Sequence, residues 1–75
     1  MPKLPRIPAE LVIRALKRAR FYEHHQTGSH VQMKNMTQKD LRITIPLKKK
    51  DLSSKTLKSI IKQAKLTVEE FINLL

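Results

Sequence analysis

A histidine follows the glycine turn of this sequence and is accompanied by several basic residues. His30 comes directly after Gly28-Ser29, and imidazole is the side chain best suited to accept a proton near neutral pH. One reaction open to it is the attack of a ribose 2′-OH on its own phosphodiester, which needs neither a metal nor a deep pocket. The phosphate must be held and its developing charge stabilised. The basic residues expected to do this are Lys34, Arg42, Lys48, Lys49 and Lys50.

The same histidine has an ordinary explanation. A single strand histidine beside a glycine turn is often only an exposed polar residue, and the pattern alone favours that interpretation. Ser29 is not expected to be a nucleophile, since no orienting His and Asp are legible around it. We expect Ser29 to form hydrogen bonds in the turn and to lie among the nucleic-acid contacts. For the general acid the sequence offers only Lys34 as a guess.

The remaining histidines make a weak case for metal. His24 and His25 are adjacent, and consecutive strand residues point to opposite faces, so the two rings are not expected to share an ion. The sequence has no cysteine. We therefore expect no metal and no cofactor. His24 has one further possibility, which is to lie across the hairpin from His30 and share a proton with it.

Charge and size narrow the class of protein. The 75 residues carry 16 Lys and Arg against 6 Asp and Glu, a net charge of +10. This size allows a single domain, residues 1–75, without room for a large substrate-enclosing core. Because 40% of the residues are hydrophobic and recur periodically, a disordered basic tail is excluded. The charge indicates a polyanionic partner, which is nucleic acid, an anionic membrane or an acidic protein.

Location follows from what the sequence lacks. No apolar run approaches the roughly 20 residues that span a bilayer, and the start of the chain lacks the apolar stretch of a signal peptide. The absence of cysteine fits a reducing compartment. We therefore expect a cytoplasmic protein without a membrane partner.

Spacing predicts the elements that must position these residues. Apolar residues at helical spacing, including Leu11, predict a helix over 8–19. A hairpin follows, with strands 21–26 and 29–35 around a turn at Thr27-Gly28. Strict alternation predicts a third strand over 41–45, ended by Pro46. Ser53 or Ser54 is expected to cap a second helix, and a capping box from Thr67 to Glu70 predicts a short helix over 68–74.

This order predicts a small α+β domain of the form α-β-β-β-α with a short C-terminal helix. Alternation along the strands gives each sheet face its own residues. The face packed on the helices is expected to carry Val31, Met33, Leu41, Ile43 and Ile45. The open face is expected to carry His30, Gln32, Lys34, Arg42 and Thr44. The open face is therefore basic and contains the histidine.

Three segments, read in order, carry a family resemblance. They are Gln26-Thr27-Gly28-Ser29-His30, Leu41-Arg42-Ile43-Thr44-Ile45-Pro46, and residues 55–64, Lys-Thr-Leu-Lys-Ser-Ile-Ile-Lys-Gln-Ala. Together with Leu4-Pro5, Ala15-Leu16-Lys17, Phe21 and Val68-Glu69-Glu70-Phe71, they resemble the HicA family of small mRNA interferase toxins. The resemblance covers nearly the whole chain. It implies the α-β-β-β-α fold of double-stranded-RNA-binding domains, in agreement with the order argued from spacing.

What the resemblance implies about function is specific. HicA-like proteins are endoribonucleases that cleave messenger RNA, and a HicB-like antitoxin covers their active surface. Their catalytic histidine lies in the Gly-Ser-His motif, which here is His30, and this makes the catalytic interpretation the favoured one. We expect a toxin of a type II toxin–antitoxin system that is a monomer when free and a hetero-oligomer with its antitoxin.

The chain also departs from the family pattern. Arg20 precedes Phe21 where a glycine is usual, and Lys55 and Lys65 stand where glycines are common. Arg20 and Lys65 fall at helix C-termini where left-handed backbone geometry is often required, at a cost of roughly 1 kcal/mol for a residue with a Cβ.

Two alternative functions use the same surface. The first is a non-catalytic module of the same fold that binds structured RNA by its shape and phosphates. The second is an adaptor whose basic surface binds an acidic protein. RNA cleavage that survives chelation of metals separates the toxin from both.

Overall fold

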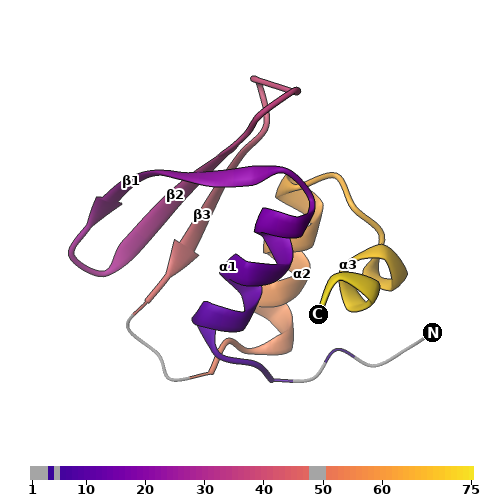
Figure 1. Ribbon diagram of the computed structural model, residues 1–75. Helices are drawn as coiled ribbons and strands as arrows, with labels where there is room; N and C mark the ends of the chain where they lie inside the picture. The colour runs from indigo at the N-terminus through magenta and orange to yellow at the C-terminus, as the bar shows by residue number, and fades with distance from the viewer. Residues whose placement is uncertain (1–3, 5, 48–50) are drawn as a thin grey trace.

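The computed structural model describes residues 4, 6–47 and 51–75. Its elements, in chain order, are α1 (Ala9–Arg18), β1 (Phe21–Thr27), β2 (His30–Asn35), β3 (Arg42–Pro46), α2 (Ser54–Gln63) and α3 (Val68–Leu74). Figure 1 shows the helices gathered on one face of a three-stranded sheet, with the other face uncovered. The predicted α+β order is confirmed. None of the helices in the described part of the chain is long and apolar enough to cross a membrane.

The sheet is antiparallel in the order β1-β2-β3. Thr27 pairs with His30, so the hairpin turn is Gly28-Ser29, one residue later than predicted. Gly28 has a φ of +34°, and glycine in the first position of a two-residue hairpin loop permits such a backbone at no steric cost. The third strand also begins and ends one residue later than predicted, and Pro46 is its last residue.

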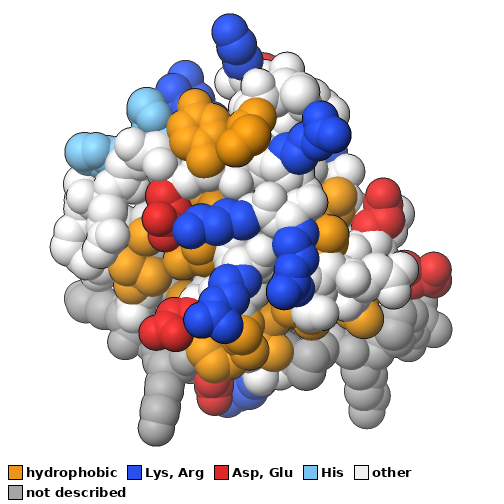
Figure 2. Space-filling view, viewed as in Figure 1, with side chains coloured by type: hydrophobic (Ala, Val, Ile, Leu, Met, Phe, Trp, Pro, Cys, Tyr) orange, Lys and Arg blue, Asp and Glu red, His pale blue; other side chains and the backbone are white. Residues whose placement is uncertain are grey.

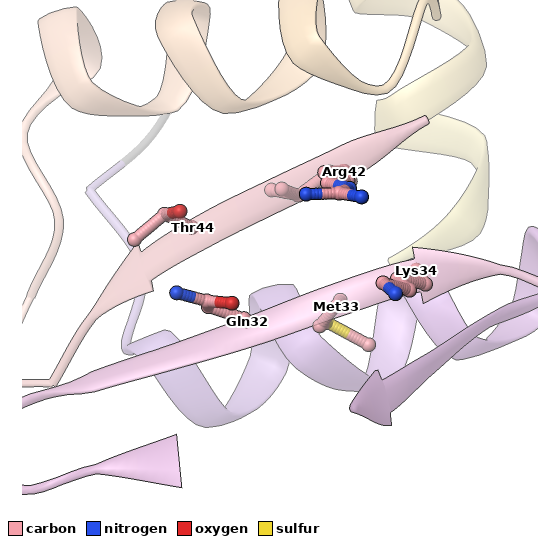
Figure 3. A pocket seen from close by; sticks show the side chains of 6 residues that line it. Gln32, Met33, Lys34, Arg42 and Thr44 are labelled. Carbon is pink, nitrogen blue, oxygen red and sulfur yellow. The ribbon is translucent and has the colours of Figure 1, made fainter. Parts of the chain in front are cut away.

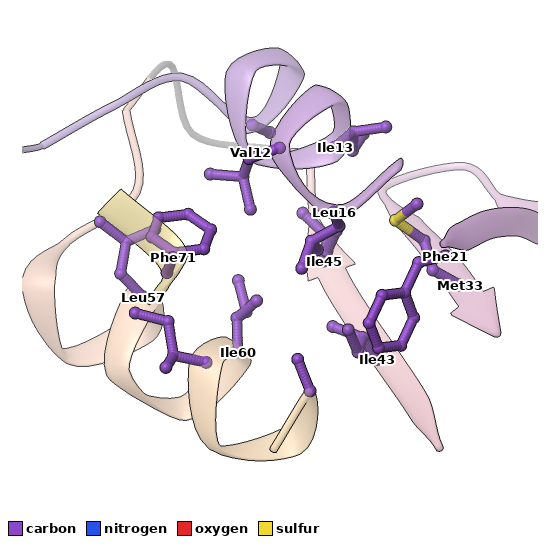
Figure 4. Packing of buried hydrophobic residues seen from close by; sticks show 14 of the residues in the cluster. Val12, Ile13, Leu16, Phe21, Met33, Ile43, Ile45, Leu57, Ile60 and Phe71 are labelled. Carbon is purple, nitrogen blue, oxygen red and sulfur yellow. The ribbon is translucent and has the colours of Figure 1, made fainter. Parts of the chain in front are cut away.

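The core lies between the sheet and the helices. Figure 4 shows side chains of α1, α2 and α3 meeting those of the strands, among them Leu16, Leu57, Ile43, Ile45 and Phe71. All five sheet residues predicted for this face are buried. Leu11, predicted to be part of the buried stripe of α1, is instead 42% exposed, while Ile13 is buried. The inward face of α1 is thus rotated relative to the predicted one.

The two helix ends that lack glycine adopt the left-handed backbone. Arg20 has a φ of 68° and Lys65 a φ of 57°. After α2, the Lys65 amide donates to the Lys62 carbonyl (3.1 Å) and the Leu66 amide donates to the Ile61 carbonyl (3.1 Å). These two bonds define a Schellman motif, which usually has glycine where Lys65 stands. Both predicted left-handed positions are therefore occupied by residues that carry a Cβ.

The predicted helix caps are present. The Ser53 hydroxyl accepts a hydrogen bond from the Thr56 amide, which settles the choice between Ser53 and Ser54. Thr67 and Glu70 form the reciprocal capping box at the start of α3. Each cap satisfies amides that the helix itself leaves unpaired.

Asn35 is the one buried polar residue among those the structure describes. Its Nδ2 donates to the Ala19 carbonyl (3.3 Å), and its Oδ1 accepts from the amides of Thr37 and Gln38 and from the Thr37 hydroxyl. The Asn35 side chain thereby connects the end of α1 to the loop that follows β2.

Candidate functional site

The open face of the sheet consists of three cross-strand rows. Directly paired residues of antiparallel strands project from the same face, so the register assigns each row. The rows are Thr27–His30–Pro46, His25–Gln32–Thr44 and Tyr22–Lys34–Arg42. Neighbouring rows are two residues apart, or about 6.6 Å along a strand. The five residues predicted for this face all lie on it.

His30 occupies the row at the hairpin end. Its side chain is exposed, and its Nδ1 lies 3.0 Å from the Ser29 hydroxyl oxygen. In the tautomer in which Nδ1–H donates to that oxygen, Nε2 keeps a free lone pair directed away from Ser29, as a general base requires. Ser29 is itself half-buried, and its carbonyl accepts a hydrogen bond from the Leu47 amide (2.6 Å). Ser29, predicted as a turn and nucleic-acid contact, therefore lies against the imidazole and orients it.

Lys34 and Arg42 form the cationic row at the other end of the face. They are direct cross-strand partners, and Figure 3 shows their side chains next to each other, with Gln32 and Thr44 forming the neighbouring pair. The two pairs line a hollow of about 220 Å³, which is also bordered by the intervening residues Met33 and Ile43, whose side chains are buried in the core. Like charges placed directly opposite each other destabilise a sheet, and none of the nine row residues is acidic. Two cations therefore lie side by side with no carboxylate among the row residues.

The structure does not bring Lys34 to His30. The two residues are four positions apart on β2, which corresponds to about 13 Å along an extended strand. A general acid must come within hydrogen-bond distance of the same leaving oxygen. Lys34 is therefore poorly placed to act as the general acid for a reaction at His30.

The predicted contacts Lys48, Lys49 and Lys50 lie outside the described residues. Their neighbours in the chain are Leu47, whose amide binds the carbonyl of Ser29, and Asp51.

A β-bulge places the other histidines differently from the prediction. Glu23 pairs with Met33 and His25 with Gln32, so His24 is an extra residue in β1. The His24 ring lies edge-on to Tyr22, with 6.4 Å between the centroids and 84° between the planes. Because Tyr22 and His25 both lie on the open face, the expectation that His24 and His25 face apart is wrong. Thr27, and not His24, lies across from His30.

Metal ligands do not gather in the part of the chain that the structure describes. No group of three or more His, Cys, Asp or Glu side chains there is arranged to hold an ion. Sequence reasoning missed two features, the bulge at His24 and the exposed Tyr22. The bulge has no residue signature, whereas Tyr22 could have been assigned to the open face, because it follows the apolar Phe21 in a strand whose side chains alternate.

A second basic surface lies on the helical layer. Figure 2 shows Lys and Arg side chains gathered over α1, and the exposed basic residues of this helix are Arg14, Lys17 and Arg18. Lys17 lies 3.6 Å from the Glu23 carboxylate, and Arg18 Nη1 donates to the Leu74 carbonyl (2.5 Å). These contacts tie α1 to β1 and α3, so part of the stripe has a structural role.

The comparisons with known proteins agree with the fold. A family model described as the HicA toxin of bacterial toxin–antitoxin systems matches residues 9–66. The matched span begins at α1 and ends just after α2, so it includes the whole open face. No curated protein matches the chain.

Proposed function

The chain belongs to the HicA toxin family of bacterial toxin–antitoxin systems, and we propose that it is a cytoplasmic endoribonuclease that cleaves messenger RNA with His30 as general base. The observation that carries this proposal is the position of His30. Its imidazole is exposed at one end of a sheet face without acidic residues, and Ser29 holds its Nδ1. A base that is both oriented and open to solvent suits a long, flexible substrate.

The proposed reaction needs no nucleophile from the protein. Nε2 of His30 takes the proton of a ribose 2′-OH, and the 2′-oxygen attacks the adjacent phosphorus. The bond from phosphorus to the 5′-oxygen breaks, and that oxygen takes a proton from solvent. The products are a 2′,3′-cyclic phosphate and a 5′-hydroxyl. Because the attacking oxygen belongs to the RNA, neither a metal-bound water nor a cofactor enters the balance.

The rest of the open face serves to bind the RNA. Lys34 and Arg42, about 13 Å from His30, would bind a phosphate other than the one being cleaved. The lysine run 48–50, which lies outside the described residues, is proposed to add phosphate contacts of its own. Each phosphate contact makes the affinity fall as salt rises, so binding is expected to be strongly salt-dependent.

The partner that restrains the toxin is expected to be complementary to the same face. We propose that a HicB-like antitoxin covers the rows around His30 and presents carboxylates to Lys34 and Arg42. With a net charge of +10, the free toxin repels its own copies. The free protein is therefore proposed to be a monomer, and the inhibited form a hetero-oligomer with the antitoxin.

A second function is favoured by one observation, the separation of the cationic row from His30. A module that only binds RNA needs the cations and makes no use of an oriented histidine. Cleavage assays distinguish the two functions, since a binding module leaves the RNA intact.

The test is incubation of the purified protein with RNA in EDTA, beside His30→Ala and His25→Ala. His25 is an exposed histidine of the same face, one row of side chains nearer the bulge by register, and so controls for loss of an imidazole. We expect cleavage by the parent and by His25→Ala, and a loss of at least 100-fold in His30→Ala, as for removal of a general base. Binding of intact RNA by the parent without cleavage would favour the binding module.

A further inference from the structure

Tyr22 is the one surface aromatic of this protein. The chain has three aromatic residues of the Phe, Trp and Tyr class, and two of them, Phe21 and Phe71, are buried in the core. Tyr22 is 38% exposed and lies on the open face, in the same cross-strand row as Lys34 and Arg42. The exposed aromatic surface of the chain therefore lies beside its paired cations.

The surroundings of Tyr22 hold the ring without covering it. The His24 ring meets it edge-on, with a centroid separation of 6.4 Å, an arrangement that aromatic pairs prefer. The contact is local, because Tyr22 and His24 are two residues apart in β1 and such side chains project from the same face of a strand. Met36, which is 61% exposed, follows the last residue of β2, and its amide donates a hydrogen bond to the Arg20 carbonyl (2.8 Å) just before β1. Figure 2 shows hydrophobic side chains next to histidine, Lys and Arg side chains along the upper part of the molecule.

We propose that Tyr22, supported by His24, is a stacking platform for one base of the RNA whose phosphate is bound by Lys34 and Arg42. An aromatic ring beside a cationic groove is the combination by which proteins bind single-stranded nucleic acid without reading its sequence. This inference rests on the proposed function, because RNA is taken as the ligand. It adds a subsite that lies about 13 Å from the general base.

The subsite contributes to binding and leaves the chemical step unaffected. The Tyr22 row is two rows away from His30, so the stacked base belongs to a nucleotide other than the one that is cleaved. Its stacking is the same in the ground state and in the transition state. Loss of the ring should therefore raise KM and leave kcat unchanged.

The sequence provides a probe of this site. Tyr22 is the single tyrosine, and there is no tryptophan, so intrinsic fluorescence reports on this ring alone. The protein is used as His30→Ala, so that single-stranded RNA is not consumed. We expect RNA to quench the tyrosine emission, with a midpoint equal to the Kd measured independently from the anisotropy of labelled RNA.

Variants complete the test. Tyr22→Ala should weaken RNA binding about tenfold, within the range known for a base stacked on an aromatic ring, whereas Tyr22→Phe should bind like the parent. Leu11→Ala removes an exposed hydrophobic side chain from α1 and should change nothing. RNA that binds by anisotropy without quenching, or a Tyr22→Ala that binds like the parent, overturns the subsite but leaves the nuclease standing. Absence of any RNA binding overturns the proposed function, and the subsite with it.

Discussion

The two faces of the sheet differ in every property that decides their roles. On the helix side, Val31, Met33, Ile43 and Ile45 are buried in one continuous apolar cluster. On the open side, the residues that alternate with them are polar, and two cations face each other across β2 and β3. The second arrangement costs stability where the first supplies it. Alternate residues of the same strand therefore serve separate purposes, since those on one face fold the protein and those on the other are proposed to bind its ligand.

The largest effect is expected from adjacent residues on opposite faces. Ile43 is fully buried and Thr44 is exposed. Ile43→Ala should lower the free energy of unfolding by about 2–5 kcal/mol, because it removes buried methyl groups and leaves a cavity. Thr44→Ala should change it by less than about 0.5 kcal/mol. Urea unfolding of both variants measures the difference, and equal losses would show that the faces are not energetically separate.

The cationic row provides the reverse test. The double variant Lys34→Ala/Arg42→Ala should be as stable as the parent or more stable by a few tenths of a kcal/mol, because it removes the repulsion between two like charges. RNA affinity should fall, and the slope of log K against log salt should become shallower by about 1.4 for two phosphate contacts to a single strand.

Lys58→Ala is the matched control for that experiment. Lys58 is exposed on α2, in the helical layer, so its removal should leave the salt slope as in the parent. If the salt slope changed by the same amount per lost charge in Lys58→Ala and in the double variant, RNA binding would depend on net charge and not on the open face.

The smallest effect is expected at a helix end, which belongs to neither face. Lys65 has a φ of 57° in the Schellman motif after α2. Lys65→Gly should stabilise the protein by up to about 1 kcal/mol, because glycine adopts this backbone without steric cost. Lys58→Gly makes the same change inside α2 and should destabilise by about 1 kcal/mol. Thermal unfolding compares the two, and destabilisation by both would contradict the left-handed cap. RNA cleavage should be unchanged in each.

Alternation and capping were sufficient to predict most of the fold. The period of two assigned residues 30–34 of β2 and 42–45 of β3 to their faces, and Ser53, Thr67 and Glu70 marked the helix starts. Strand alternation and helix caps depend only on residues that are close in the sequence, so they can be predicted without knowledge of the tertiary structure. Family resemblance, not spacing, distinguished His30 from an ordinary strand histidine, and its catalytic role stays a prediction.

What was missed depends on backbone geometry and on tertiary contacts. The bulge at His24 adds one residue to β1, and no residue type marks it. The hairpin turn likewise lies one residue later than predicted, because the sequence does not fix which residues pair across it. Leu11 and Ile13 are equally apolar, so only packing decides which is buried. The buried position of Asn35 could have been predicted, because it continues the alternation of Val31 and Met33 on the core face. A polar side chain buried there must be hydrogen-bonded.

The most direct test of the central claim replaces one ribose in the substrate. The cleavage site in an RNA oligonucleotide is first mapped with the parent protein in EDTA, and the nucleotide on its 5′ side is then made 2′-deoxy. Attack by the 2′-OH, with His30 as base, predicts that this bond is no longer cut, that other sites still are, and that products of the all-ribose strand end in a 2′,3′-cyclic phosphate. Continued cleavage of the 2′-deoxy bond would contradict it.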